Sequence, residues 1–335
     1  MPSSIPAPLS PPVPSRAAAT VSPPCRSEHL HRPPNRPPHR QAGEARRSEP
    51  MPGLTPGERN WGVLAFMAAL HVLAAVALLP RFWSLPALAS LLVLYWVTAC
   101  LGVTIGYHRL LSHRALRVPR WLERVFATCG ALSCQHGPID WVGLHRHHHK
   151  FSDTDPDHHN SHRGFWWSHM GWMFRPIPAM GAVPRLSGDL AADPYYRWLN
   201  RWFLLLQLPL AAQLFWVGTT TGAGGWGLVL WGIPLRLVLV YHATWLVNSA
   251  THRWGYVLHA SGDGSRNNPW VAALTFGEGW HNTHHAYPHS ARHGWGWREP
   301  DLTWLHIQLL QRLGLARQVR LPQPLLARAA SRGVR

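Results

Sequence analysis

Histidines recur in three short clusters whose spacing suits metal binding. The clusters comprise His108 and His113 in "HRLLSH", His145, His148 and His149 in "HRHHH", and His281, His284 and His285 in "HNTHH". In the second and third clusters the first, fourth and fifth positions are histidine. Residues three and four apart share one face of an α-helix, so each triplet can present its imidazoles to one centre.

The other spacings indicate where these clusters lie. His108 and His113 are five residues apart, which is ~140° around a helix axis, so they are expected to straddle a helix end. A fourth element, "NSATH", places Asn248 and His252 four residues apart. Eight clustered histidines and His252 are too many for one tetrahedral zinc ion. They suit two ions with four or five ligands each.

The remaining histidines are divided by their surroundings. Those predicted to be ordinary core or surface residues are His71, His136, His147, His242, His259, His289, His293 and His306. Those left open are His158, His159, His162 and His169. The stretch "DTDPDHH" is either structural or a support for the site, with Asp153, Asp155 or Asp157 holding a ligand imidazole in its metal-binding tautomer.

Four apolar blocks predict the elements that position these histidines. They span residues 61–80, 83–106, 202–219 and 224–247. Each approaches the ~20 residues that an α-helix needs to cross a bilayer. Tight connections with few charges join them in pairs, which is typical of helical hairpins. Arg236 interrupts the fourth block and is expected to face protein or water. Buried helices of a large soluble protein are the less favoured alternative.

The charge pattern predicts the orientation. The net charge of +17 lies mostly in residues 1–60, in 107–201 and after residue 252. Two hairpins put these regions on one side, and Arg and Lys mark the cytoplasmic side. The sequence therefore predicts an all-α integral membrane protein of the cell membrane, with four transmembrane helices in two hairpins. A helical cytoplasmic cap would hold the histidine-rich site, and both termini would be cytoplasmic.

Composition divides the chain into three parts. Residues 1–50 are rich in proline and arginine and are predicted to be a disordered extension. Residues 51–320 form the predicted membrane domain, and residues 321–335 a basic tail. Because Met51 opens "MPGLTPGERNWG", translation is hypothesised to begin there, which the intact mass of the native protein would test. Nucleic-acid binding is not expected, since no recognised module accompanies the basic charge.

The surroundings of the histidines favour a redox metal. Neutral imidazole suits zinc, copper, nickel and iron alike, so the ligands alone do not decide. A paired histidine site beside apolar helices suits O₂ chemistry on a lipid chain. Side-chain acids, bases and nucleophiles cannot attack an unactivated C–H bond, so a metal must carry that step. Two iron ions are the predicted cofactor.

The motifs "GYHRLLSHR", "GLHRHHHKFSDTDPDHHNSHRGFWWSHMGWM", "NSATHRWG" and "GEGWHNTHH" resemble the membrane-bound fatty acid desaturases of the delta-9 type. The resemblance covers roughly residues 60–320. It implies a di-iron enzyme that uses O₂ and two electrons to introduce a cis double bond into a saturated acyl chain. The iron ligands that it implies are His108, His113, His145, His148, His149, His252, His281, His284 and His285. By the same resemblance Asn248 completes one iron site through water, and Trp141 binds substrate.

One departure from the family bears on the carrier of the acyl chain. The animal acyl-coenzyme A branch has a basic residue between the tryptophan of the second box and its first histidine. Here the run is "WVGLH", with Gly143 in that place. A missing charge weakens the hold on a nucleotide phosphate. A chain esterified in a membrane lipid is therefore favoured, and acyl-coenzyme A remains open.

The resemblance also implies an external electron donor. The four cysteines lack metal-binding spacing, and no flavin fingerprint or heme-binding segment occurs. An acidic ferredoxin or a cytochrome b5-like protein is expected to dock on the basic cytoplasmic face. The main alternative function is a lipid hydroxylase, which can use the same histidines and O₂. A membrane metal hydrolase or transporter is less favoured, because the ionisable residues gather at the ends of the spans.

Overall fold

The computed structural model describes residues 58–325. Helices and loops make up this part of the chain, with three isolated bridges and no strand among the described residues. The prediction of an all-α fold is therefore confirmed for the described part. The predicted extension, residues 1–50, lies outside it, as do residues 326–335 of the predicted tail.

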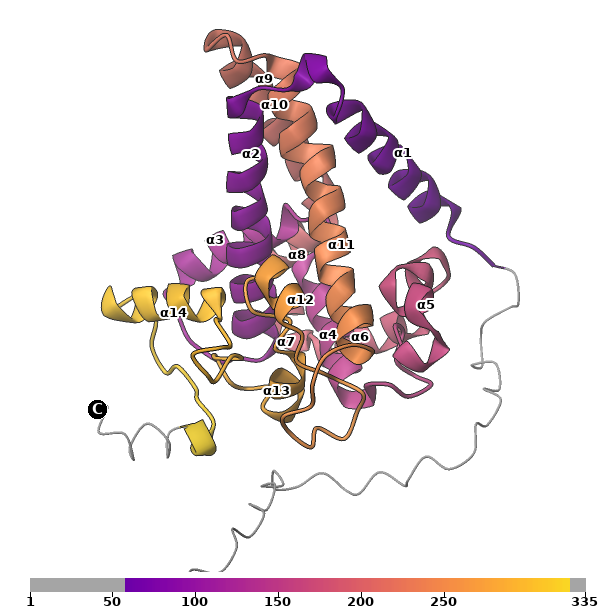
Figure 1. The fold of residues 1–335 in the computed structure, drawn as a ribbon, viewed down its shortest axis with the longest axis vertical. Helices are drawn as coiled ribbons and strands as arrows, with labels where there is room; N and C mark the ends of the chain where they lie inside the picture. Colours follow the sequence, from indigo (N-terminus) through magenta and orange to yellow (C-terminus); the bar gives the residue numbers. More distant parts are fainter. Residues whose placement is uncertain (1–57, 326–335) are drawn as a thin grey trace, which may run out of the picture. The chain divides into compact units, whose positions relative to one another are not determined.

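The α-helices are α1 (Trp61–Ala77), α2 (Leu85–Tyr95), α3 (Arg120–Ala131), α4 (Pro138–Phe151), α5 (Phe165–His169), α6 (Val183–Leu186), α7 (Gly188–Ala191), α8 (Pro194–Trp202), α9 (Gln207–Thr220), α10 (Gly225–Leu230), α11 (Arg236–Ser249), α12 (Pro269–Leu274), α13 (His281–Ala286) and α14 (Leu302–Arg312). Two segments are π-helices, η2 (Trp96–Ser112) and η7 (Trp231–Leu235). The 3-10 helices are η1 (Pro80–Phe82), η3 (Ser161–Arg163), η4 (Gly171–Phe174), η5 (Pro178–Ala182), η6 (Phe203–Leu206) and η8 (Ala250–His252). Figure 1 shows α2 and α11 leading into a group of helices that includes α4, α7 and α13.

Three helices are long and apolar enough to cross a membrane. They are the continuous runs Leu85–Ser112, Pro194–Thr220 and Gly225–His252, of 28, 27 and 28 residues. At ~1.5 Å per residue each exceeds the ~30 Å of hydrocarbon. Helix α1, which falls in the first of the four predicted spans (residues 61–80), has 17 residues and is shorter than these three. The described part of the chain thus has three of the four predicted spans by length and composition.

The long helices extend beyond the apolar blocks that predicted them. The second block was expected to end at residue 106, but η2 continues α2 to Ser112. The fourth was expected to end at residue 247, but α11 and η8 continue to His252. Hydropathy therefore underestimates the length of both helices, because their last turns are polar. These added turns carry His108 and His252 out of the apolar region.

Arg236 shows how a charge is accommodated inside a long apolar helix. Its side chain is fully buried, and its guanidinium donates to the backbone oxygens of Gly232 and Leu132, each at 2.8 Å. It also donates to Gln207 Oε1 at 3.0 Å. The arginine therefore links α11 to α9 and to the end of α3. This agrees with the expectation that it faces protein, because each polar contact replaces water.

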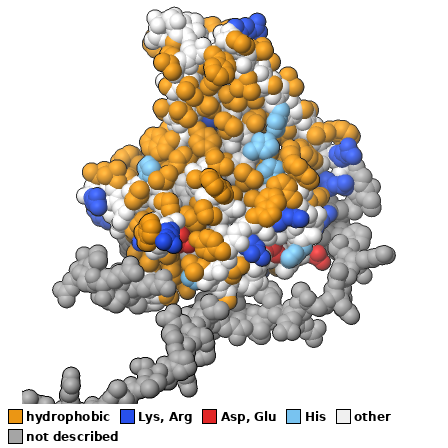
Figure 2. Space-filling view, viewed as in Figure 1, with side chains coloured by type: hydrophobic (Ala, Val, Ile, Leu, Met, Phe, Trp, Pro, Cys, Tyr) orange, Lys and Arg blue, Asp and Glu red, His pale blue; other side chains and the backbone are white. Residues whose placement is uncertain are grey.

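A row of histidines links α1 to the rest of the chain. The Nε2 atoms of His71 and His242 lie 3.1 Å apart, and His242 Nδ1 lies 3.0 Å from His169 Nε2. His169 Nδ1 in turn lies 3.0 Å from Ser249 Oγ. Figure 2 shows pale-blue histidine side chains amid the hydrophobic surface of this face. Polar contacts of this kind hold helices together where apolar packing alone has little driving force.

Close packing of η2 against α3 predicts a strong effect of one added methyl group. A Cβ at Gly102 would lie 2.4 Å from the backbone of Cys129 and Gly130. Gly102→Ala should force the helices apart and lower the unfolding free energy by about 1–3 kcal/mol, as overpacking does. A thermal melt in detergent measures this. Gly188→Ala is the matched control, because its Cβ would meet nothing within 4 Å. Equal melting temperatures for both variants would contradict the packing.

Candidate metal centre

Helices from distant parts of the chain converge at the site. Helix η2 carries His108 and is capped at its end by His113, and η8 ends with His252. Helices α4 and α13 each carry one histidine triplet. Because α2 with η2 and α11 with η8 both end at the short helices, the histidines at these ends meet the two triplets.

The start of α4 is fixed by its sequence and by a helix that lies elsewhere in the chain. Pro138 occupies the first helical turn, where its missing N–H costs nothing. Asn200 Oδ1, on α8, accepts from the backbone N–H groups of Ile139 and Asp140 at 3.0 and 3.1 Å. These bonds satisfy N–H groups that the helix leaves open. The triplet on α4 therefore starts from an anchored helix.

The nine predicted histidines form two groups. The first contains His108, His113, His145, His149 and His284, and the second contains His148, His252, His281 and His285. Within each group, one ring nitrogen from every residue lies within 4.8 Å of the others. None of the nine side chains is exposed. The structure thus brings together all nine residues in sets of five and four.

Four of the nine imidazoles contact carboxylates through the nitrogen that faces away from their group. The distances from Nδ1 to a carboxylate oxygen are 2.9 Å for His148 and Asp157, 2.8 Å for His252 and Asp153, 2.6 Å for His285 and Asp263, and 2.5 Å for His108 and Glu278. When Nδ1–H donates to a carboxylate, Nε2 keeps its lone pair. Such contacts orient a ring and favour the tautomer that binds metal.

Two of these carboxylates were anticipated and two were missed. Asp153 and Asp157 belong to the stretch predicted to support the site. Asp263 lies in the turn-like "SGDGS", which carries no signal of a role. Glu278 lies within "GEGWHNTHH", three residues before His281. Its place inside that motif, next to a histidine triplet, is the signal that could have found it.

The pair His148 and His285 indicates that a cation fits here. Each donates Nδ1–H to an aspartate, so in the neutral rings both Nε2 atoms carry lone pairs. These two Nε2 atoms lie 3.4 Å apart. Facing lone pairs repel one another unless a proton or a metal ion lies between them, and the four convergent imidazoles of this group suit a metal ion. A metal ion satisfies both nitrogens at once.

Electrostatics keeps the imidazoles available as ligands. Burial lowers the pKa of His145, His149 and His281 well below the usual histidine value, and neighbouring imidazoles lower it further. These rings are therefore neutral at physiological pH. Burial alone would raise the pKa of the Asp263 carboxyl, but His285 beside it holds that pKa below its usual value. Asp263 is thus an anion that accepts from His285.

A buried ion network lies behind the first group. Arg109 is fully buried and donates to Glu278 and Asp301 at 3.0 Å each. Glu278 also contacts His108, so the guanidinium and an imidazole share one carboxylate. Removing one partner of such a network leaves an uncompensated buried charge, which is strongly destabilising.

Two cavities meet at the histidine groups. The larger has a volume of about 370 Å³ and is bounded by α1, α4 and α11 among other segments. The smaller, of about 60 Å³, lies along η2 and α11. The residues that line both cavities are Trp141, His145, Thr244 and Asn248. The indole of Trp141 stacks on the ring of His145 at 4.9 Å between centroids.

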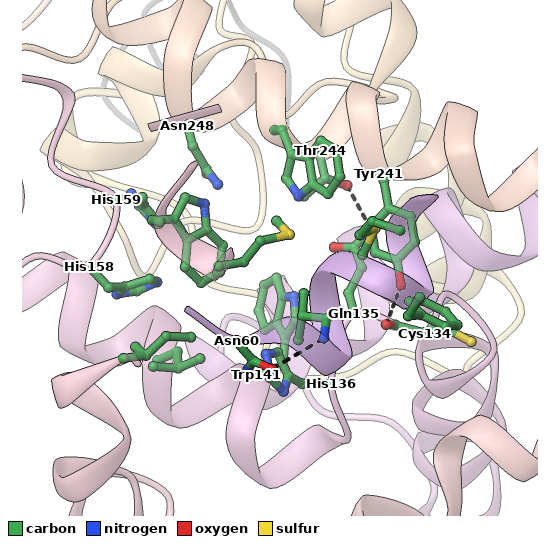
Figure 3. Close-up of a pocket in the computed structure, with 18 of the residues that line it drawn as sticks. Asn60, Cys134, Gln135, His136, Trp141, His158, His159, Tyr241, Thr244 and Asn248 are labelled. Carbon is green, nitrogen blue, oxygen red and sulfur yellow. Dashed lines mark hydrogen bonds between the residues drawn. The ribbon is translucent and has the colours of Figure 1, made fainter. Parts of the chain in front are cut away.

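Figure 3 shows the polar side chains of the larger cavity. His158 and His159 lie on one side, and Tyr241 and Cys134 lie on the other. The sequence alone does not assign a role to these two histidines. The ring of His159 lies 4.2 Å from that of His148, so it belongs to the surroundings of the second group. Asn248, predicted to complete one site, lines both cavities beside His145.

The histidines predicted to be ordinary separate into different environments. His147 packs against Phe151 and belongs to neither group, as expected for its position on α4. His293, predicted to be an ordinary core or surface residue, is fully buried, and its ring lies 4.4 Å from that of His284, so it packs directly against the first group. His289 is exposed, and its ring lies 6.4 Å from that of His113.

Comparisons with known proteins agree with this geometry. Residues 82–313 match the family model described as fatty acid desaturase. The chain is 52% identical over 271 residues to a Synechocystis protein named sn-1 stearoyl-lipid 9-desaturase, covering 81% of this chain and 82% of the relative. A protein of the same name from Anabaena variabilis is 51% identical, covering 78% and 94%. A Nostoc protein named sn-2 palmitoyl-lipid 9-desaturase is 48% identical, covering 78% and 90%.

The matched residues include all nine histidines and Trp141, so the resemblance seen in the motifs extends over the whole site. An oxidoreductase that acts on fatty acyl chains accounts for both the histidine groups and the cavities that meet there. The chain belongs to the fatty acid desaturase family.

Proposed function

We propose that this protein is an acyl-lipid delta-9 desaturase that holds two iron ions and introduces a cis double bond into a saturated chain esterified in a membrane lipid. Support comes from relatives named stearoyl- and palmitoyl-lipid 9-desaturases. The observation that carries the proposal is the junction of the two cavities. Trp141, His145, Thr244 and Asn248 line both, so a chain threaded through them passes the histidine groups partway along its length.

The nine histidines are the proposed iron ligands, with Asn248 beside them, and Asp153, Asp157, Asp263 and Glu278 orient four of the rings. When bound, the irons would supply the reduction of O₂ that makes an unactivated C–H bond reactive. The overall change removes two hydrogens from neighbouring carbons and, with O₂, two electrons and two protons, gives two waters. The protein residues position the carbons and exclude water.

Residues at the junction of the two cavities are proposed to position the chain. Gln135 Nε2 donates to Thr244 Oγ1 at 3.0 Å, which closes one side of the larger cavity. Trp141 is fixed by stacking on His145. A chain that occupies both cavities contacts Trp141 and Thr244, which line both. These contacts would help to set which carbon pair faces the histidines.

The carrier is proposed to be a lipid because the protein offers no room for the basic residue of the animal acyl-coenzyme A branch. A Cβ at Gly143 would lie 2.9 Å from Val183 Cγ1 and 3.1 Å from Ser187 Oγ. A long side chain at this position would clash with α6. Recognition of a nucleotide phosphate from here is therefore disfavoured.

We further propose that α1 is the fourth span and that the histidine groups face the cytoplasm. Helix α1 is about 25 Å long at ~1.5 Å per residue, close to the hydrocarbon thickness. Its exposed side chains include Phe66, Val72 and Leu73, which suit contact with lipid. A short span is accommodated by local thinning of the bilayer. The arginine-rich connections support cytoplasmic termini.

A reconstituted reaction tests the proposed function. Iron-loaded protein in vesicles of distearoyl phospholipid would receive O₂ and a chemical reductant. The mass of the intact lipid would then be measured by mass spectrometry. Loss of two hydrogens from the lipid is expected. Gain of one oxygen would instead favour a hydroxylase. Product from stearoyl-coenzyme A and none from the phospholipid would contradict the lipid carrier.

The smaller cavity predicts a change in chain-length preference. Ala99 lines it and is buried, so Ala99→Phe should fill the space that the methyl end of the chain occupies. The ratio of stearoyl to palmitoyl product should fall about tenfold, because the two extra methylenes of the stearoyl chain would each lose ~0.8 kcal/mol of burial free energy. Competition between the two lipids measures this ratio. Leu92→Phe, at an exposed position before it, is the control. An unchanged ratio in Ala99→Phe would place the methyl end elsewhere.

A further inference from the structure

The proposed reaction consumes two electrons that the described residues do not provide. Cys100, Cys129 and Cys134 are free thiols, and none belongs to the two histidine groups. A redox partner must therefore approach the histidine groups, whose side chains are not exposed. The inference that follows rests on the proposed function and concerns where that partner docks.

His289 connects the first histidine group to the surface. Its side chain is exposed, and its Nδ1–H donates to the backbone oxygen of His113 at 3.0 Å. The two rings lie 6.4 Å apart. The rate of electron transfer falls steeply with distance, so this short hydrogen-bonded route favours electron transfer from the surface to the first group. The route ends at His113, which belongs to the first group and is a proposed metal ligand.

Three chain segments lie side by side around His289. Arg117 and Arg317 exchange two backbone hydrogen bonds of 2.8 Å. Arg320 N–H donates to Ala115 O at 2.8 Å, and Ala291 N–H donates to Arg320 O at 2.9 Å. The segment after His113 is thus joined to residues 317–320, which are joined to the segment after His289.

This arrangement gathers arginines beside His289. The basic surface consists of Arg117, Arg292, Arg317 and Arg320. Arg117, Arg317 and Arg320 are exposed, and Arg292 is half-buried. Within residues 58–325 none of the four forms an ion pair. Arg292 interacts with the buried carboxylates of Asp301 and Glu299, so the exposed Arg117, Arg317 and Arg320 supply most of the charge that an approaching protein would meet.

Nearby acidic groups do not cancel this charge. Asp189 accepts from Arg114 at 2.6 Å and from Arg146 at 2.8 Å, so its one negative charge is already paired with two arginines. Asp301 is buried and bound to Arg109, and Glu299, which also acts on Arg292, is buried and accepts from Tyr256 and from the Trp295 N–H. The basic surface keeps a net positive charge next to an exposed imidazole. A surface of this kind raises the association rate of an acidic protein.

The direction of the chain favours a water-soluble partner over a lipid. The exposed leucines Leu302, Leu305 and Leu309 lie on α14, which precedes the basic surface. Figure 1 shows the yellow segment after α14 running away from the long helices. Arg317 and Arg320 lie in that segment. The basic surface therefore lies on the side away from the spans.

We propose that an acidic one-electron carrier protein docks on this basic surface and delivers electrons through His289 to the metal centre. Two reduced carriers are oxidised by one electron each for every double bond formed. Two protons from water and two hydrogens from the acyl chain accompany these electrons, and O₂ leaves as two waters. Atoms and electrons balance with the carrier as the only added reductant.

Charge reversal tests the docking surface. The double variant Arg117→Glu, Arg317→Glu should raise the KM for a reduced acidic [2Fe–2S] ferredoxin by ~10-fold or more at low salt. The difference should shrink as ionic strength rises. The control Arg163→Glu, Arg185→Glu makes the same charge change at exposed positions outside the basic surface and should change the KM less than about twofold. Equal effects of the two double variants would overturn the proposal.

A donor-free reaction separates docking from catalysis. Single turnover of dithionite-reduced enzyme should give the same product yield in wild type and in the Arg117→Glu, Arg317→Glu variant. If wild type gives no product under these conditions, the proposed function fails rather than the docking proposal. If the variant loses activity with dithionite only in anionic vesicles, the basic surface binds lipid and the docking proposal is wrong.

His289 is tested by the rate of electron transfer. His289→Leu should slow the re-oxidation of bound ferredoxin in stopped-flow measurements by ~10-fold or more, with little change in the ferredoxin KM. The dithionite-driven yield should stay at the wild-type level. His289→Asn keeps an N–H donor for His113 O and should recover part of the rate. Transfer at the wild-type rate in His289→Leu would rule out this route.

Discussion

Replacing His148 by alanine is expected to abolish desaturation while the protein remains in the membrane. His148 contributes to the second histidine group, and Asp157 fixes its ring at 2.9 Å. Alanine removes one of four nitrogens and leaves a buried carboxylate without its donor. Loss of a ligand that no neighbour can replace should reduce activity by ~1,000-fold or more, as losses of essential catalytic groups do. Product formation in vesicles and bound iron per chain measure both consequences.

His147→Ala is the matched control for this experiment. His147 is the preceding residue on α4, is also buried, and packs against Phe151 instead of joining either group. The control should retain most of its activity and its full iron content. An active His148→Ala variant, or equal losses in both variants, would contradict the assignment of the second group.

Removing the carboxylate of Asp263 is expected to weaken the site without touching a ligand. Asp263 accepts from His285 Nδ1 at 2.6 Å and also accepts from Ser265 and from Ser261. Asp263→Ala frees the His285 ring to rotate and removes the partner that selects its tautomer. Metal affinity or activity should fall by ~10–100-fold, the range seen when such outer partners are lost. Iron retained against a chelator measures the affinity.

Asp263→Asn separates orientation from charge. Its amide oxygen can still accept from His285 Nδ1–H, so the ring keeps its orientation while the negative charge is lost. Iron retention should lie between that of wild type and that of Asp263→Ala. Retention in Asp263→Ala equal to wild type would show that the His285 ring is held by its surroundings alone.

Sequence spacing identified the residues that meet but not everything that holds them. The two triplets were predictable because i, i+3, i+4 spacing leaves little choice of face on a helix. Asp153 and Asp157 were within reach because they follow the second cluster closely in sequence. Asp263 could not be foreseen, since nothing in "SGDGS" indicates that the loop folds back against α13. Contacts between distant segments are set by tertiary packing.

The membrane helices show a similar division. Hydropathy located the apolar blocks but ended them at residues 106 and 247, where the polar turns that carry His108 and His252 begin. The same scale treated α1 as equivalent to the others, although it is a 17-residue helix. The row His71, His242 and His169 was also missed, because each histidine stands alone in sequence and only the fold aligns them.

The histidine groups are proposed to carry delta-9 desaturation of a lipid-bound chain. The most direct measurement is the fatty acid profile of a bacterial host that lacks this activity, by gas chromatography with double-bond localisation, with and without the protein. We expect a new cis-9 monoene in the membrane lipids that disappears in the His148→Ala variant. Membrane-inserted, iron-loaded protein that receives a competent donor and leaves the profile unchanged would contradict it.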